Sequence, residues 1–116
     1  MITGTHAIVY ASDADATRAF CRDVLGLSFV DSGGGWLIFD LPPAELGVHP
    51  TGEGVATIGH ELFLTCDDLD KTMADLRDKG AQFEGEVVDR GWGLYATLVV
   101  PGAGTMGLYQ PKHRQP

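Results

Sequence analysis

The sequence predicts an α+β fold made of two copies of one β-α-β-β-β module that share a core. Two observations predict it. The strand-like run from His6 to Asp13 matches the run from Glu61 to Asp68 at an offset of 55 (61 − 6 and 68 − 13). Each run also leads into an amphipathic helix that is expected to end at a glycine, Gly26 or Gly80. A repeat this long exceeds a short solenoid unit and indicates two modules with a cleft between them.

The first module is expected to span residues 1–50. Residues 3–11 are rich in β-branched and aromatic side chains, which is typical of a strand. Ser12 is a suitable N-cap for the helix, whose apolar residues recur every four positions up to Gly26. Three further strands are predicted at 27–30, 36–41 and 44–49, with a hairpin turn at 31–35 and a break at Pro42 and Pro43.

The second module is expected to span residues 59–111, after a linker at 51–58. A strand at 60–66 precedes a helix that Asp67 or Asp68 caps, with a buried stripe of Leu69, Met73 and Leu76. The remaining strands are predicted at 83–88, 93–100 and 105–110. Each half alone is too small for a stable core, so we expect residues 1–116 to form one domain.

Composition narrows the range of partners and locations. The chain of 116 residues carries a net charge of −8, from 8 Lys and Arg against 16 Asp and Glu, which argues against nucleic acids and anionic membranes. No apolar run reaches membrane-spanning length, and no signal peptide is recognisable. Cys21 and Cys66 are expected to be buried, reduced thiols. We therefore expect a cytoplasmic protein.

Alternation along the predicted strands separates an aliphatic face from a mixed one. In strand 60–66, Leu62 and Leu64 face one way and Glu61 and Phe63 face the other. A plain solvated face would carry Lys, Thr and Glu, whereas aromatic side chains with a few polar groups are typical of a ligand pocket. The alternative is that the rings fill the core. The expected ligand-binding residues are Tyr10, Trp36, Phe63, Trp92, Tyr95 and Tyr109.

The order and duplication of these stretches resemble the vicinal oxygen chelate superfamily, which includes glyoxalases, extradiol dioxygenases and bleomycin-resistance proteins. The resemblance covers residues 6–27, 36–50, 61–83 and 102–111. It implies an eight-stranded, strongly curved mixed sheet around a cleft, with the helices on the convex side. It also implies that a chain of this length forms a homodimer.

Catalytic relatives hold a divalent metal with side chains from the first and last strand of each module. By resemblance, His6 occupies the first ligand position and Glu61 its counterpart. The glutamate expected in the last strand is replaced by Gly107. In the fourth strand, His49 or Glu45 could supply a third ligand. Oxygen and nitrogen ligands suit Fe, Mn, Ni, Zn or Mg, so one such ion is a possible cofactor.

Three functions stay open at this point. The first is a binding protein that sequesters a small organic molecule, and the acidic chain favours a planar, cationic guest. The second is a metal-dependent lyase, isomerase or dioxygenase, in which Glu61 or Glu45 moves a proton. The third is a module whose site has lapsed and which serves dimerisation or regulation. The missing glutamate at Gly107 favours the first of these.

Overall fold

The computed structural model describes residues 6–9, 11–44, 61–91 and 93–112, and they form an α+β fold as predicted. In the first half, helix α1 (Ala14–Asp23) is followed by strands β1 (Phe29–Asp31) and β2 (Leu37–Phe39). In the second half, helix α2 (Leu69–Asp78) follows the short strand β3 (Phe63–Thr65). Three longer strands complete the chain: β4 (Phe83–Asp89), β5 (Gly93–Val99) and β6 (Thr105–Pro111).

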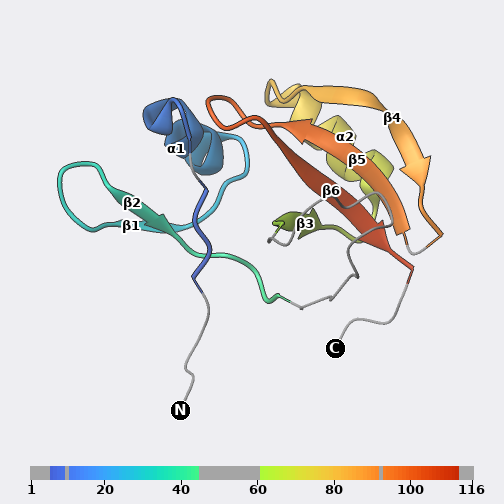
Figure 1. Ribbon diagram of the computed structural model, residues 1–116, viewed down its shortest axis with the longest axis horizontal. Helices are drawn as coiled ribbons and strands as arrows, with labels where there is room; N and C mark the ends of the chain where they lie inside the picture. The colour runs from blue at the N-terminus through green and yellow to red at the C-terminus, as the bar shows by residue number, and fades with distance from the viewer. Residues whose placement is uncertain (1–5, 10, 45–60, 92, 113–116) are drawn as a thin grey trace, which may run out of the picture.

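The second half forms a four-stranded sheet in the order β3-β6-β5-β4, with α2 packed on one face (Figure 1). β4, β5 and β6 form an antiparallel meander, whereas β3 pairs in parallel with β6, so that Phe63 lies beside Gly107. β1 and β2 form a separate antiparallel sheet of two strands. The sheet of the second half is therefore mixed, as predicted.

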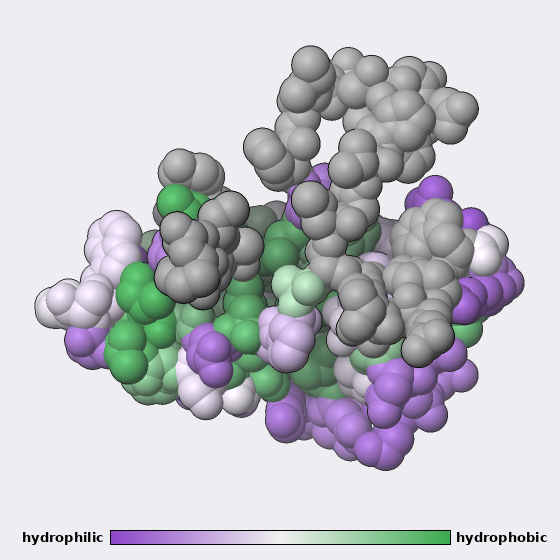
Figure 2. Space-filling view, turned by 90° about the horizontal axis from the view of Figure 1, so that it is seen from below, coloured by the Kyte–Doolittle hydropathy of each residue, from purple (hydrophilic) through white to green (hydrophobic). Residues whose placement is uncertain are grey.

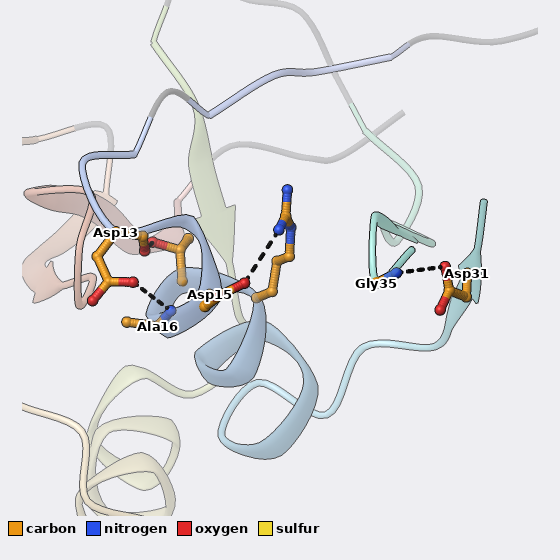
Figure 3. A network of polar contacts seen from close by, with 7 residues as sticks. Asp13, Asp15, Ala16, Asp31 and Gly35 are labelled. Carbon is orange, nitrogen blue, oxygen red and sulfur yellow. Dashed lines mark hydrogen bonds and ion pairs between the residues drawn. The ribbon is translucent and has the colours of Figure 1, made fainter. Parts of the chain in front are cut away.

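Both helices begin at an aspartate. The side chain of Asp13 accepts a hydrogen bond from the Ala16 N–H at 3.0 Å (Figure 3). Asp68 accepts one from the Lys71 N–H at 3.1 Å. A carboxylate at this position pairs a free amide and also interacts favourably with the positive end of the helix dipole. Of the two predicted caps of the second helix, Asp67 and Asp68, the structure has Asp68. In the first helix Asp13, rather than Ser12, is the cap.

The core lies between α2 and the sheet. Alternate residues of the two central strands, Ala96 and Leu98 of β5 and Leu108 of β6, are buried on the face that α2 covers. The predicted stripe of Leu69, Met73 and Leu76 is buried against them, and Phe20 of α1 joins the same cluster. Because side chains alternate along a strand, Tyr95 and Tyr109 lie on the opposite face.

The start of α1 is bonded to the turn between β5 and β6. The carbonyl oxygen of Gly102 accepts hydrogen bonds from the backbone N–H groups of Ser12 at 2.7 Å and Asp13 at 3.2 Å. The buried hydroxyl of Thr17 donates to the carbonyl of Pro101 at 2.7 Å. Gly102 has a φ of +79°, and a Cβ there would lie 2.9 Å from that of Asp13. Only glycine allows this approach without strain.

The strand predictions need correction in the first half. The described residues contain six strands, so an eight-stranded curved sheet is not confirmed. Residues 6–9 are exposed and belong to no strand, although a strand was predicted over 3–11; the strands of the described ranges do not pair with them. The predicted strand at 44–49 lies outside the described residues, except for Ala44, which is not in a strand. The linker at 51–58 also lies outside them.

Candidate functional site

Three aromatic rings meet on the sheet face opposite α2. The ring of Phe63 lies 5.8 Å from that of Tyr109 and 5.9 Å from that of Tyr95, measured between centroids, and both contacts are edge-to-face. All three residues are partly exposed. We call this surface the aromatic face; it comprises Phe63, Tyr95, Tyr109, Gly107 and Thr97. The predicted ligand residues Phe63, Tyr95 and Tyr109 are thus brought together from three neighbouring strands.

Gly107 makes this arrangement possible. A Cβ at this position would lie 2.6 Å from Cε1 of Phe63 and 2.8 Å from Cε2 of Tyr95. Distances this short do not occur between real side chains, so any larger residue would push both rings away. The position at which the resemblance implies a metal-binding glutamate is therefore closed by aromatic packing.

Arg90 stands at one end of the aromatic face. Its guanidinium carbon lies 5.4 Å from the centroid of the Tyr95 ring, in a cation–π arrangement. The neighbouring Asp89 is paired instead with Lys112, whose Nζ lies 2.8 Å and 2.9 Å from the two carboxylate oxygens. The Lys112 ammonium and the Gly91 N–H hold the pKa of Asp89 below its usual value. The sequence analysis missed Arg90, although it is two residues beyond Val88, which pairs with Tyr95.

Two of the predicted metal ligands, His6 and Glu61, lie within the described residues. His6 and Glu61 are both exposed and lie outside the strands. Within the described ranges, no group of three or more His, Cys, Asp or Glu side chains could hold a metal ion. His49 and Glu45 lie outside these ranges, as do the predicted ligand residues Tyr10 and Trp92. The metal site proposed from the sequence, with His6, Glu61 and either His49 or Glu45 as ligands, stays a prediction.

Trp36 occupies a different environment from the three rings. It precedes β2, is 62% exposed, and carries the Arg18 guanidinium at 4.8 Å from its ring centroid. Ring contacts among the described residues join Phe63 to the two tyrosines and Phe29 to Phe39, and Trp36 takes part in none of them. Its predicted role in the ligand wall stays untested.

A hollow of about 440 Å³ lies between α1 and the turn after α2. Ala16, Ala19 and Phe20 line it from α1, and residues 80–82 line it from the turn. Asp23 stands beside it, with its carboxylate 2.7 Å and 2.8 Å from Arg22 nitrogen atoms, and this pairing lowers the pKa of Asp23. None of the predicted site residues lines this hollow.

The fold and the aromatic face define a class: small α+β proteins with a helix-backed mixed sheet whose other face offers aromatic side chains. The family model "Glyoxalase/Bleomycin resistance protein/Dioxygenase superfamily" matches residues 5–102. The chain belongs to this superfamily, which confirms the resemblance. No curated protein matches the sequence significantly.

Several solved structures share the fold. TnmS3, an antibiotic binding protein from Streptomyces sp. CB03234, superimposes with a TM-score of 0.67 at 23% identity, covering 96% of this chain and 98% of that one. A lactoylglutathione lyase from Agrobacterium tumefaciens gives a TM-score of 0.65 at 18% identity, covering 93% and 92%. A glyoxalase/bleomycin resistance protein/dioxygenase from Nocardioides gives 0.66 at 17% identity, covering 100% and 88%. At these identities the similarity establishes the fold alone.

No helix in the described ranges has both the length and the apolar composition needed to cross a lipid bilayer.

Proposed function

We propose that this protein binds a planar small organic molecule on the aromatic face and acts by sequestering it, as in a resistance role. The observation that carries the proposal is the packing of Phe63, Tyr95 and Tyr109 around Gly107. Superfamily membership supports it, and so does the similarity in fold to TnmS3, a protein described as antibiotic-binding. The further ligand residues proposed from the sequence are Tyr10, Trp36 and Trp92.

The chemistry of the aromatic face suits a flat guest. Aromatic rings bury a large apolar area and prefer edge-to-face or offset contacts with another ring. The three side chains are anchored on adjacent strands, so little conformational freedom is lost when a ligand arrives. The two tyrosines carry phenol groups, and a mixture of apolar area with a few polar groups is typical of small-molecule sites.

Calorimetric titration with planar aromatic compounds tests this proposal. Phe63→Leu should weaken binding roughly two- to tenfold, since an aromatic contact contributes about 0.5–1.5 kcal/mol beyond the area it buries. Phe39→Leu is the matched control, because Phe39 also packs against an aromatic ring but on the β1–β2 sheet, at 5.8 Å from Phe29. Equal affinities in the two variants, or no binding by the wild-type protein, would contradict the proposal.

A metal-dependent lyase, isomerase or dioxygenase is the alternative. Its proposed ligands are His6, Glu61 and either His49 or Glu45, holding one divalent ion such as Fe, Mn, Ni, Zn or Mg, with Glu61 or Glu45 as the proton carrier. The packing at Gly107 counts against it, because a glutamate there has no room beside Phe63 and Tyr95. Such an ion would supply Lewis-acid chemistry when bound.

Metal analysis of protein purified without chelators separates the two functions. Close to one ion per chain, lost in both His6→Gln and Glu61→Gln, would support the enzyme and weigh against sequestration. Glu86→Gln, which removes an exposed carboxylate from β4, serves as the control for a general loss of charge.

We also propose that the protein is a cytoplasmic homodimer. β1 and β2 have three residues each and, among the described residues, pair only with each other; a two-stranded sheet this short needs further packing to be stable in water. Hydrophobic residues gather at the end of the molecule where these strands lie (Figure 2). The exposed large hydrophobic side chains of β1 and of the turn before β2 are Phe29, Val30 and Trp36, of which Val30 is 67% exposed. Two free thiols support the location, since such cysteines are typical of reducing compartments.

Light scattering on a sizing column measures the mass in solution. A dimer in the wild type and a monomer in Val30→Lys is the expected result, with Val87→Lys of β4 as the control for adding a charge to an exposed valine. A monomeric wild-type protein would contradict the proposal.

A further inference from the structure

The aromatic face has a positive charge fixed at one end. The Arg90 guanidinium lies over the Tyr95 ring, and the Arg90 backbone N–H donates to the carbonyl oxygen of Gly93 at 2.9 Å. The backbone bond closes the turn between β4 and β5, and the ring holds the side chain by its negative face. The charge is therefore placed against one of the rings proposed to bind the ligand.

Arg90 makes no ion pair with any carboxylate in the described ranges. Its neighbour Asp89 lies on the other side of the strand, since Asp89 pairs with Leu94 whereas Val88 pairs with Tyr95. The Asp89 carboxylate is also occupied by Lys112 and by the Gly91 N–H at 2.9 Å. The charge of Arg90 is thus not neutralised by its neighbour and is available to a bound molecule.

Carboxylates lie at the opposite end of the aromatic face. Glu84 is exposed and pairs with Thr97, which lies beside Gly107. Glu61 precedes β3, and since β3 runs parallel to β6 it lies towards the Thr105 end. The charge along the aromatic face therefore changes from negative, near these carboxylates, to positive at Arg90 beyond Tyr95.

Deepening the proposed function and resting on it, we propose that the preferred guest is a planar aromatic molecule that carries an acidic group. Its ring packs against Phe63, Tyr95 and Tyr109, and its negative charge pairs with Arg90. A cationic guest would have to displace Arg90 from Tyr95 and would meet a like charge there. The net charge of −8 favours cations only at long range, and salt screens this effect beyond about 10 Å at 0.1 M. The Arg90 guanidinium, which is adjacent to the ring, therefore determines that an anionic ligand is preferred over a cationic one.

Three probes of equal ring size test the proposal by calorimetry: naphthoate as the anion, naphthol as the neutral compound and naphthylmethylammonium as the cation. Naphthoate should bind the wild-type protein roughly five- to tenfold more tightly than naphthol, and the cation should bind most weakly. Arg90→Gln should remove the advantage of naphthoate over naphthol, whereas Arg90→Lys should keep part of this advantage. Arg18→Gln, which removes the guanidinium stacked on Trp36, is the matched control.

The outcomes separate this inference from the proposed function. If all three probes bind with similar affinity, or the cation binds best, the inference is wrong and the binding function stands. If no probe binds, the proposed function fails and the inference fails with it. A preference for naphthoate that survives Arg90→Gln places the anion elsewhere and also overturns the inference. Raising the salt concentration should weaken naphthoate binding in the wild type and leave naphthol binding nearly unchanged.

Discussion

Gly107 lies beside Phe63 in neighbouring parallel strands, and the Phe63 ring fills the space that a side chain at position 107 would need. Two residues that are 44 positions apart (107 − 63) thus form one structural unit. Because Gly107 of β6 has no side chain, the rings of Phe63, Tyr95 and Tyr109 can meet.

Replacing Gly107 by alanine should destabilise the protein by about 1–3 kcal/mol, because the added methyl group forces Phe63 and Tyr95 out of their positions. Urea unfolding followed by circular dichroism measures this. The double variant Gly107→Ala/Phe63→Leu should lose less than the sum of the two single variants, because the smaller side chain gives the methyl group room. Strict additivity would show that the two residues do not share the space.

Removing the Thr17 hydroxyl should weaken the attachment of α1 to the second half. Thr17→Val keeps the shape of the side chain but leaves the Pro101 carbonyl without this donor, at a cost of about 1–3 kcal/mol. Thr105→Val, at an exposed position in β6, is the control and should change the free energy of unfolding little. Amide exchange in α1 should rise in Thr17→Val alone, and equal exchange in both variants would contradict this role.

The pair formed by Asp89 and Lys112 should make stability depend on pH. The folded-state pKa of Asp89 lies below its unfolded value, so the pair stabilises fully above the unfolded value of about 4 and its contribution is lost as the pH falls through the lower folded pKa. The melting temperature of Asp89→Asn should therefore be below that of the wild type at neutral pH, and the two should converge in acid. A difference in melting temperature that stays constant with pH would show that the Asp89–Lys112 pair does not cause the pH dependence.

Both thiols should react slowly in the native protein. Burial raises the pKa of Cys21 and of Cys66, and the Cys66 Sγ also lies 3.7 Å from the carbonyl oxygen of Tyr109. Because the thiolate is the reactive form, labelling by a thiol reagent at neutral pH should be slower than for a free cysteine and should accelerate in urea. Rapid modification of either residue under native conditions would contradict the described burial.

The sequence was most informative where the pattern is local. Asp68, the stripe of Leu69 and Met73, and the strands of the second half were predicted to within a few residues, because caps and periodicity act over a single turn or strand. Alternation also assigned Phe63 and Leu64 correctly to opposite faces. In the first half the strands are shorter than predicted, and β1 begins at Phe29 rather than Leu27.

Other features of the site depend on partners distant in sequence. The parallel pairing of β3 with β6 has no local signal, and the role of Gly107 becomes visible only when the Phe63 ring lies on it. The position of Arg90 follows from its contact with the Tyr95 ring, which no periodic pattern describes. The metal ligands His49 and Glu45, predicted by resemblance, stay predictions.

The parallel pairing also determines when the sheet can be completed. Because β6 lies between β3 and β5, the first strand of this sheet to leave the ribosome must wait until the last has been synthesised. During that interval both edges of β3 are unpaired, a state in which strands can associate with other chains. Its length of only three residues limits the area exposed to such misassembly while the nascent chain grows.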